Sequence, residues 1–334
     1  MNILITGGAG FIGSQAGWYF QNLDHNVTLL DNMSYGKEDN LTIDGTSIGE
    51  FILADVRDPS FADHCINKDV IIHLAGIAPL PDCQMNPTAA YENNVVGTLN
   101  VLEACRKMNV PKIIFSSTSA IYENCHTVPF KEDLIEKEPD LAYSMSKRAC
   151  EMICQGYVNN YALNIVIMRF FNVYGPHQDF MRKQPPLMGY IIKCLLQDTI
   201  PTFYSSGHQR RDYVYIDDVV RMMRMIIEKS PTPGSVFNTC SGRDYSVREI
   251  YDLYSEAFKK DISACYDDSS RFWDRYPILF AGKKPLSKER LVKEVNKHSL
   301  GSYHHANEIL GWSPSVTIEQ GIAECVKYAK HLIL

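Results

Sequence analysis

The sequence predicts an α/β fold in which a doubly wound parallel sheet precedes a smaller α/β substrate domain. Short apolar segments rich in β-branched residues alternate with helical segments as far as about residue 171. That alternation is typical of a parallel sheet covered on both faces. The chain also opens with a strand, a glycine-rich turn and a helix, MNILITGGAGFIG. A turn of this kind is the arrangement that holds a dinucleotide diphosphate.

Composition narrows the function classes. The 334 residues suffice for one large domain or two coupled ones, and the net charge of −6 argues against general binding to nucleic acid or a membrane surface. No apolar run is long enough to span a membrane, and the N-terminus lacks a basic lead and a cleavage site. We therefore expect a cytoplasmic protein. Its ten cysteines lack metal-binding spacing, so we expect reduced thiols and no metal site.

The glycines of the opening turn have separate tasks. Gly7, Gly10 and Gly13 follow the strand expected at 2–6. The turn needs a residue that tolerates positive φ, and a side chain at Gly10 would block the approach of a diphosphate to the helix N-terminus. Gly13 allows the helix to lie close to the strand. A flexible loop is the alternative interpretation, but the position between strand and helix favours a dinucleotide site.

Acidic and small residues end the next three strands. Asp31 ends the strand at 26–30, where a carboxylate accepts hydrogen bonds from ribose hydroxyls and repels the extra phosphate of NADP. It therefore favours NAD over NADP, unless it is only a solvated carboxylate. Asp55 follows the strand at 50–53 and is expected near the adenine. The strand at 69–74 runs into small residues that leave room for the nicotinamide half of the cofactor.

A hydroxyl cluster and a Tyr–Lys pair supply the chemistry. The strand at 112–117 ends in hydroxyl residues 116–119, and ligands bind at the carboxyl ends of such strands. Tyr143 and Lys147 lie four residues apart on one face of a helix expected to reach about Tyr161. An ammonium beside a phenol lowers the pKa of the tyrosine, which makes Tyr143 a candidate general base. The alternative interpretation of this spacing is an ordinary surface helix.

The pattern changes after the strand expected at 164–170. Residues 172–176 are expected to form a turn, and loops lengthen from there. We place the start of a substrate-binding portion at this point. Further strands are expected at 213–216 and 236–239, with a helix capped by Asp217 and Asp218 between them. Earlier in the chain, residues 88–107 are expected to form one long helix.

Segments along nearly the whole chain resemble the extended short-chain dehydrogenase/reductase family, in its nucleotide-sugar epimerase and dehydratase branch. They are TGGAGFIG (6–13), LLDN (29–32), ADVRD (54–58), HLAG (73–76), NNVVGTLNVLEA (93–104), FSSTSAIY (115–122), YSMSK (143–147), RFFNVYGP (169–176), RRDYVYIDD (210–218) and LGWSP (310–314).

This resemblance implies a Rossmann domain at 1–171, with 213–241 returning to it, that binds NAD, and a nucleotide-sugar domain at 172–334. It implies a homodimer formed through a four-helix bundle by the helices after Pro87 and after Tyr143. It assigns catalysis to Thr118, Tyr143 and Lys147, and substrate binding to Thr118, Asn172 and Arg211. The expected cofactor-binding residues are Gly7, Gly10, Phe11, Ile12, Gly13, Asp31, Asn32, Asp55, Val56, Leu74, Ala75, Gly76, Asn93, Ser116, Tyr143, Lys147 and Phe171.

The chain also departs from the family pattern. Dehydratases carry Asp and Glu, and decarboxylases a Glu, where this chain has Ser119 and Ala120. Pro185-Pro186 and Gly301-Ser302 replace usual nucleotide-site pairs, and Asp82 and Cys83 replace a basic residue and Ser in the sugar-facing loop. The expected activity is NAD-dependent 4-epimerisation of a nucleotide sugar through a 4-keto intermediate. A C4 dehydrogenase or reductase is the alternative, ahead of a 4,6-dehydratase or decarboxylase, and a non-catalytic NAD sensor comes last.

Overall fold

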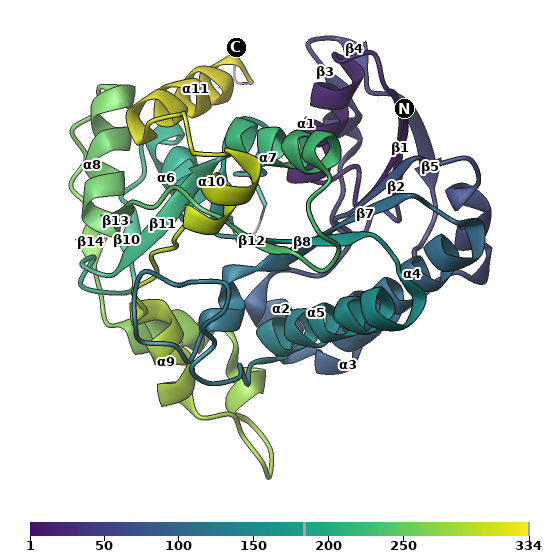
Figure 1. The fold of residues 1–334 in the computed structure, drawn as a ribbon. Helices are drawn as coiled ribbons and strands as arrows, with labels where there is room; N and C mark the ends of the chain where they lie inside the picture. Colours follow the sequence, from purple (N-terminus) through teal and green to yellow (C-terminus); the bar gives the residue numbers. More distant parts are fainter. Residues whose placement is uncertain (183–184, 333–334) are drawn as a thin grey trace.

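The computed structural model describes residues 1–182 and 185–332, so residues 183–184 and 333–334 of the expected second domain lie outside the described part. A seven-stranded sheet runs through its centre in the order β12-β8-β7-β6-β1-β2-β5, and every neighbouring pair is parallel (Figure 1). The predicted doubly wound parallel sheet is therefore confirmed. Its strands are β1 (Asn2–Thr6), β2 (Asn26–Asp31), β5 (Glu50–Leu53), β6 (Val70–His73), β7 (Lys112–Thr118), β8 (Ile165–Phe170) and β12 (Val236–Thr239).

Alternation along the strands gives the sheet two apolar faces. Ile3 and Ile5 belong to the core shared with α1 (Phe11–Gln21) and α7 (Ile216–Lys229), whereas Leu4 belongs to the core shared with α4 (Gly97–Met108) and α5 (Ala142–Tyr161). Figure 1 shows the two helix pairs on opposite faces of the sheet. A sheet buried on both faces needs apolar residues at nearly every position, which the strands supply. Short elements complete this region: η1 (Glu38–Leu41), β3 (Thr42–Ile43), β4 (Thr46–Ser47), η2 (Pro59–Cys65), α2 (Leu80–Met85) and η4 (Ser119–Tyr122).

The single helix expected at 88–107 is interrupted. The chain forms α3 (Pro87–Tyr91), then a π-helical turn, η3 (Glu92–Val96), and then α4. Within the turn, the Asn94 side chain accepts a hydrogen bond from the Ile77 amide at 2.7 Å and donates to Ser146 Oγ at 3.0 Å. Through Asn94, the widened turn links the segment after β6 to α5. The spacing of apolar residues along the chain does not show such an interruption.

Among the described residues, the second region contains two small sheets and most of the C-terminal helices. Residues 172–174, expected to form a turn, instead form a strand that pairs in parallel with Tyr213–Tyr215. The turn predicted over 172–176 is therefore wrong at 172–174, because a distant strand supplies hydrogen bonds that the local pattern could not show, whereas Pro176 does lie in a turn. The elements here are β9 (Asn172–Tyr174), α6 (Leu187–Leu196), β10 (Thr202–Phe203), β11 (Arg210–Tyr215), β13 (Asp244–Ser246), α8 (Val247–Phe258), β14 (Cys265–Tyr266), η5 (Ser269–Arg275), η6 (Pro277–Phe280), α9 (Lys288–Asn296), α10 (His304–Leu310) and α11 (Ile318–His331).

Residues 213–241, expected to return to the first domain, divide between the two regions. Strand β11 belongs to the three-stranded sheet β13-β11-β9, whereas α7 packs beside α1 and β12 joins the seven-stranded sheet. Asp218, expected to cap α7, instead accepts hydrogen bonds from the Ser315 and Val316 amides. It therefore anchors the C-terminal segment to the middle of the chain.

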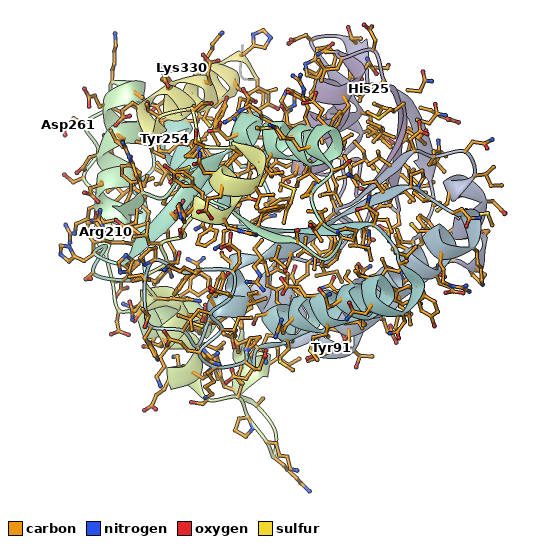
Figure 2. All side chains as sticks on the ribbon, in the orientation of Figure 1. His25, Tyr91, Arg210, Tyr254, Asp261 and Lys330 are labelled. Atoms are coloured by element: carbon orange, nitrogen blue, oxygen red, sulfur yellow. The ribbon has the colours of Figure 1, made fainter. Side chains whose placement is uncertain are left out.

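The side chains in Figure 2 separate the core from the surface. Tyr254 on α8 lies among the helices of the second region and is fully buried, whereas Asp261 and Lys330 lie at the periphery. In the described part of the chain, no helix combines the length and the apolar character that crossing a membrane requires.

Candidate active site

A cavity of about 1160 Å³ lies between the two regions, at the carboxyl ends of β1, β6, β7 and β8. The glycine turn forms one wall, and residues of the second region from Asn172 onward form the other. A smaller pocket of about 120 Å³ continues from the turn toward Asp31, and another of about 220 Å³ continues from Asn172 toward Arg211. The three spaces share lining residues, so together they make one extended site that crosses the sheet edge.

The glycine turn is built as expected for a diphosphate cradle. Gly7 has a φ of +71°, and a Cβ there would lie 2.8 Å from the Ala75 nitrogen. A Cβ at Gly13 would lie 2.2 Å from the Gly7 carbonyl oxygen, so only glycine permits this contact between α1 and the turn. Gly10 precedes α1 and lines the cavity. The helix N-terminus therefore faces space that an anion can enter.

Asp31 ends β2 and lines the small pocket beside the glycine turn. It is buried and accepts hydrogen bonds from the Ala9 amide at 3.1 Å and the Met33 amide at 2.8 Å. Burial raises its pKa, and these hydrogen bonds oppose that rise. A carboxylate oxygen has more than one acceptor position, so Asp31 can still accept from ribose hydroxyls.

With one exception, the predicted cofactor residues line the main cavity or the small pocket beside Asp31. Asp55 lines neither, because its carboxylate accepts from Asn32 at 2.8 Å and pairs with Arg57 at 2.6 Å. The adjoining Val56 lines the pocket instead. The other predicted cofactor residues that line it or the main cavity are Gly7, Gly10, Phe11, Ile12, Gly13, Asp31, Asn32, Leu74, Ala75, Gly76, Asn93, Ser116, Tyr143, Lys147 and Phe171.

The three predicted catalytic side chains all line the main cavity. Burial raises the pKa of Tyr143 to about 12, while a hydrogen bond with Thr118 acts in the opposite direction. Lys147 donates to the Ser116 carbonyl at 2.7 Å, and burial lowers the pKa of its ammonium. The expectation that Lys147 lowers the pKa of Tyr143 is therefore not met in the protein alone, because burial outweighs other influences on the phenol. A cationic nicotinamide beside the phenol would favour its ionised form.

The substrate end is centred on Arg211 and Asn172. Arg211 belongs to β11, and its guanidinium reaches the last turn of α9, where it donates to the carbonyl oxygens of Glu294 at 2.7 Å and Val295 at 3.1 Å. It forms no ion pair with any described residue, so its positive charge is not neutralised by a carboxylate at close range. Asn172 donates to the Asp212 carbonyl at 2.8 Å and lines both the main cavity and the pocket of Arg211. An unneutralised guanidinium in a pocket favours an anionic ligand.

The structure adds lining residues that the sequence did not indicate. Tyr35 follows β2 and donates to Asp82 at 2.9 Å across the cavity mouth. Asp82 lines the cavity as its place in the sugar-facing loop suggested, whereas Cys83 is fully buried and its Sγ contacts the Ile77 carbonyl. Arg182, Arg275 and Tyr276 also line the cavity. They come from distant segments without a recognisable spacing, so no local signal could have revealed them.

The positions that differ from the family pattern divide between the cavity wall and its surroundings. Asp82 and Pro186 line the main cavity, whereas Ser119 and Ala120 are not among its lining residues. Gly301 lies behind Phe171, and a Cβ there would come within 2.6 Å of the Phe171 ring. The family's usual alanine would therefore require Phe171 to shift. Glu123, the carboxyl group three residues beyond Ala120, also does not line the cavity.

A glycine-turn dinucleotide site beside a partly buried tyrosine and a buried threonine and lysine defines the class of short-chain hydride-transfer enzymes. The NAD dependent epimerase/dehydratase family model matches residues 3–240, and the chain belongs to this family. The predicted family is confirmed, and with it NAD as the cofactor that the glycine turn and Asp31 fit.

Individual relatives differ in their reactions. The chain is 29% identical to the putative UDP-glucose 4-epimerase of Methanocaldococcus jannaschii over 98% of both chains. It is 27% identical to UDP-glucuronic acid decarboxylase 1 of Danio rerio, over 98% of this chain and 72% of that one. The crystal structure of Thermotoga maritima UDP-glucose 4-epimerase with UDP-glucose has a TM-score of 0.86 and 30% identity, and each chain is covered completely.

Proposed function

We propose that this protein is an NAD-dependent nucleotide-sugar 4-epimerase. The proposal rests above all on the wall where Thr118, Tyr143 and Lys147 line one cavity with the glycine turn. This wall supplies a proton acceptor beside the expected path of the nicotinamide. It supplies no acid–base pair for elimination, because Ser119 and Ala120 replace the residues that would carry it.

The chain's own groups account for binding and proton transfer. Arg211 binds the diphosphate, and Asn172 lies beside it. Thr118 orients the sugar's 4-hydroxyl toward Tyr143, which accepts the hydroxyl proton. NAD held at the glycine turn and Asp31 would supply the hydride acceptor and donor that oxidation and reduction at C4 require. Tyr143 then gives the proton back, so the reaction is redox-neutral and regenerates every protein group.

A C4 dehydrogenase or reductase would use the same three residues and release a keto sugar. The pocket beyond Asn172 favours epimerisation, because a diphosphate held by Arg211 keeps the oxidised sugar attached while it turns. The relative that removes carbon dioxide from a uronic acid makes the decarboxylase reaction a necessary comparison. The absence of an ionisable side chain at position 120 argues against it.

The test is to incubate the purified protein with UDP-glucose, UDP-galactose, UDP-N-acetylglucosamine and UDP-glucuronic acid, and to separate the products by chromatography. We expect a 4-epimer of at least one substrate without net NADH formation. A stable keto sugar with accumulating NADH would favour the dehydrogenase, and a UDP-pentose the decarboxylase. No change with any sugar, in protein that holds NAD, would favour the sensor.

We also propose a homodimer formed by α3, η3, α4 and α5, and a cytoplasmic location. Five large hydrophobic side chains on the described residues of these helices are exposed, at 37% for Tyr91, 51% for Val96, 42% for Leu99, 63% for Met152 and 55% for Tyr161. Figure 2 shows Tyr91 at the outer surface beside α5. Light scattering of the purified protein tests the dimer. The division into an NAD-binding domain and a nucleotide-sugar domain remains part of this proposal.

A further inference from the structure

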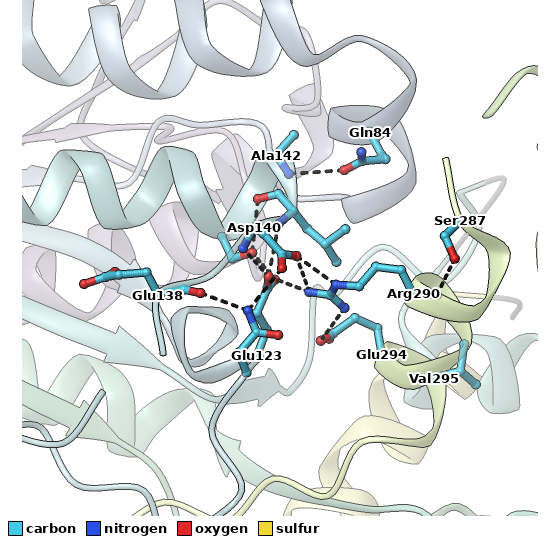
Figure 3. A network of polar contacts seen from close by, with 12 residues as sticks. Gln84, Glu123, Glu138, Asp140, Ala142, Ser287, Arg290, Glu294 and Val295 are labelled. Carbon is cyan, nitrogen blue, oxygen red and sulfur yellow. Dashed lines mark hydrogen bonds and ion pairs between the residues drawn. The ribbon is translucent and has the colours of Figure 1, made fainter. Parts of the chain in front are cut away.

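A network of polar contacts lies outside the cavity and joins the start of α5, the helix that carries Tyr143, to the second region (Figure 3). At its centre is Glu123, whose side chain is only 1% exposed. Its carboxylate accepts hydrogen bonds from the Asp140 and Leu141 amides and from the Ser144 hydroxyl. Because Tyr143 lies between these partners in the sequence, Glu123 holds the backbone that presents the catalytic tyrosine.

The same carboxylate is paired with a residue far away in the chain. Arg290 of α9 donates to Glu123 at 2.6 Å and, through Nε, to Asp140 at 2.8 Å (Figure 3). Two donors of one guanidinium fix its orientation as well as its distance. Apolar contacts join the same two parts of the chain, because Leu141 packs in one cluster with Trp273, Leu279 and Leu291.

Helix α9 then reaches the substrate end. The carbonyl oxygens of Glu294 and Val295, near the end of this helix, accept the two donors of Arg211. Carbonyl groups in the last turn of a helix lack partners within the helix and carry its negative dipole end, so they suit a guanidinium. One nine-residue helix therefore contacts both the support of Tyr143 and the support of Arg211.

We propose that Glu123 and Arg290 are positioning residues that set the distance between Tyr143 and Arg211. This inference rests on the proposed function, in which Arg211 holds the diphosphate while Tyr143 acts at C4 of the sugar. A substrate whose diphosphate is held by Arg211 brings its C4 to Tyr143 only if the distance between these two residues is fixed. Because small misplacements of reacting groups are costly, the pair acts on turnover although it touches no substrate.

The test compares turnover with binding of UDP, which needs only the Arg211 end. In Glu123→Gln and in Arg290→Met, we expect kcat to fall about tenfold or more. Affinity for UDP and NAD content should stay within about threefold of wild type, because Arg211 moves together with α9. Arg290→Lys retains the charge but not the two-donor geometry, so its kcat should lie between those of Arg290→Met and wild type.

Matched controls use the same substitutions at an exposed ion pair outside this network. Glu228→Gln and Arg224→Met each remove the pair that these two side chains form on α7. Both should keep wild-type kcat. An unchanged kcat in Glu123→Gln and Arg290→Met would overturn the inference, and so would parallel losses of kcat, UDP affinity and melting temperature, which would mark a purely structural role.

Hydrogen–deuterium exchange provides a readout that needs no activity. Glu123→Gln should speed exchange across 288–296, and Arg290→Met should speed exchange across 139–145, while the controls should change neither. Exchange that rises only around the mutated residue would contradict the coupling. If wild type turns over no sugar, the proposed function fails, but the exchange experiment still decides whether the two supports are linked.

Discussion

The cofactor end and the substrate end of the site are built in different ways. The cofactor end consists of backbone turns at the ends of consecutive strands, where glycines make room and few side chains act. The substrate end is assembled from side chains of segments as far apart as Asp82, Asn172, Arg211 and Tyr276.

The difference has a physical origin. A diphosphate is recognised by backbone N–H groups and a helix N-terminus, which a short stretch of chain can present alone. A particular sugar is recognised by directional side-chain contacts that must converge from several elements. The relatives agree with this division, since proteins about equally similar to this chain carry names of different sugar reactions.

The largest effect is expected at Tyr143, where the two ends meet. Tyr143→Phe should lower kcat about a thousandfold, because general base catalysis contributes on that scale. NAD content should not change, since the ring and its packing remain. Assays of 4-epimer formation measure the loss. Tyr157→Phe, on the same helix with its hydroxyl at Glu103, is the matched control and should keep normal turnover.

The cofactor end should be intolerant of a single methyl group. Gly13→Ala should destabilise the fold by about 3 kcal/mol and reduce bound NAD, because its Cβ would overlap the Gly7 carbonyl oxygen. Gly156→Ala on α5 has no atom within 4 Å of its Cβ, so it should stabilise the protein by about 0.5–1 kcal/mol. Denaturant unfolding compares the two. Equal unfolding free energies for the Gly13→Ala and Gly156→Ala variants would show that the turn has room for a Cβ at position 13.

Asp31 should govern the choice of cofactor. We expect NADP to bind about 10–100-fold more weakly than NAD, because its extra phosphate would face a buried carboxylate without a new partner. In Asp31→Asn the ratio of the two dissociation constants should shrink toward one. Titration by protein fluorescence checks this, and similar affinities for both cofactors in the wild type would refute the role of Asp31.

The smallest effect is expected from pH at His73, beneath the glycine turn. Burial lowers the pKa of His73 to about 3, while its ring contacts Thr6 at 2.7 Å and Thr98 at 3.1 Å. Because the unfolded chain binds a proton near pH 6.5 and the folded one does not, this group lowers stability as the pH falls. Between about pH 7.5 and 5.5, the decrease in unfolding free energy should be about 1.4 kcal/mol smaller in His73→Asn than in wild type. Equal decreases would contradict this.

The sequence predicted the central sheet and the glycine turn because each strand and each glycine is specified by its immediate neighbours. It also indicated Thr118, Tyr143 and Lys147, whose side chains do line one cavity. It mistook β9 for a turn and missed the interruption at Asn94, because distant partners decide both. The raised pKa of Tyr143 was likewise out of reach, since burial is a property of the assembled fold. Arg290 gave no signal for the same reason.

The placement of β12 has a consequence for how the chain acquires its structure during synthesis. This edge strand pairs with β8, and the Thr239 carbonyl accepts the Phe171 amide, yet 65 residues separate the two strands, counted from 171 to 235. Those residues include β9, α6 and β11 of the other region. A nascent chain that ends at Phe171 therefore leaves the edge of β8 open to pairing with other chains. The first region can close its sheet only after much of the second has left the ribosome, so the two regions fold as interdependent parts rather than in succession.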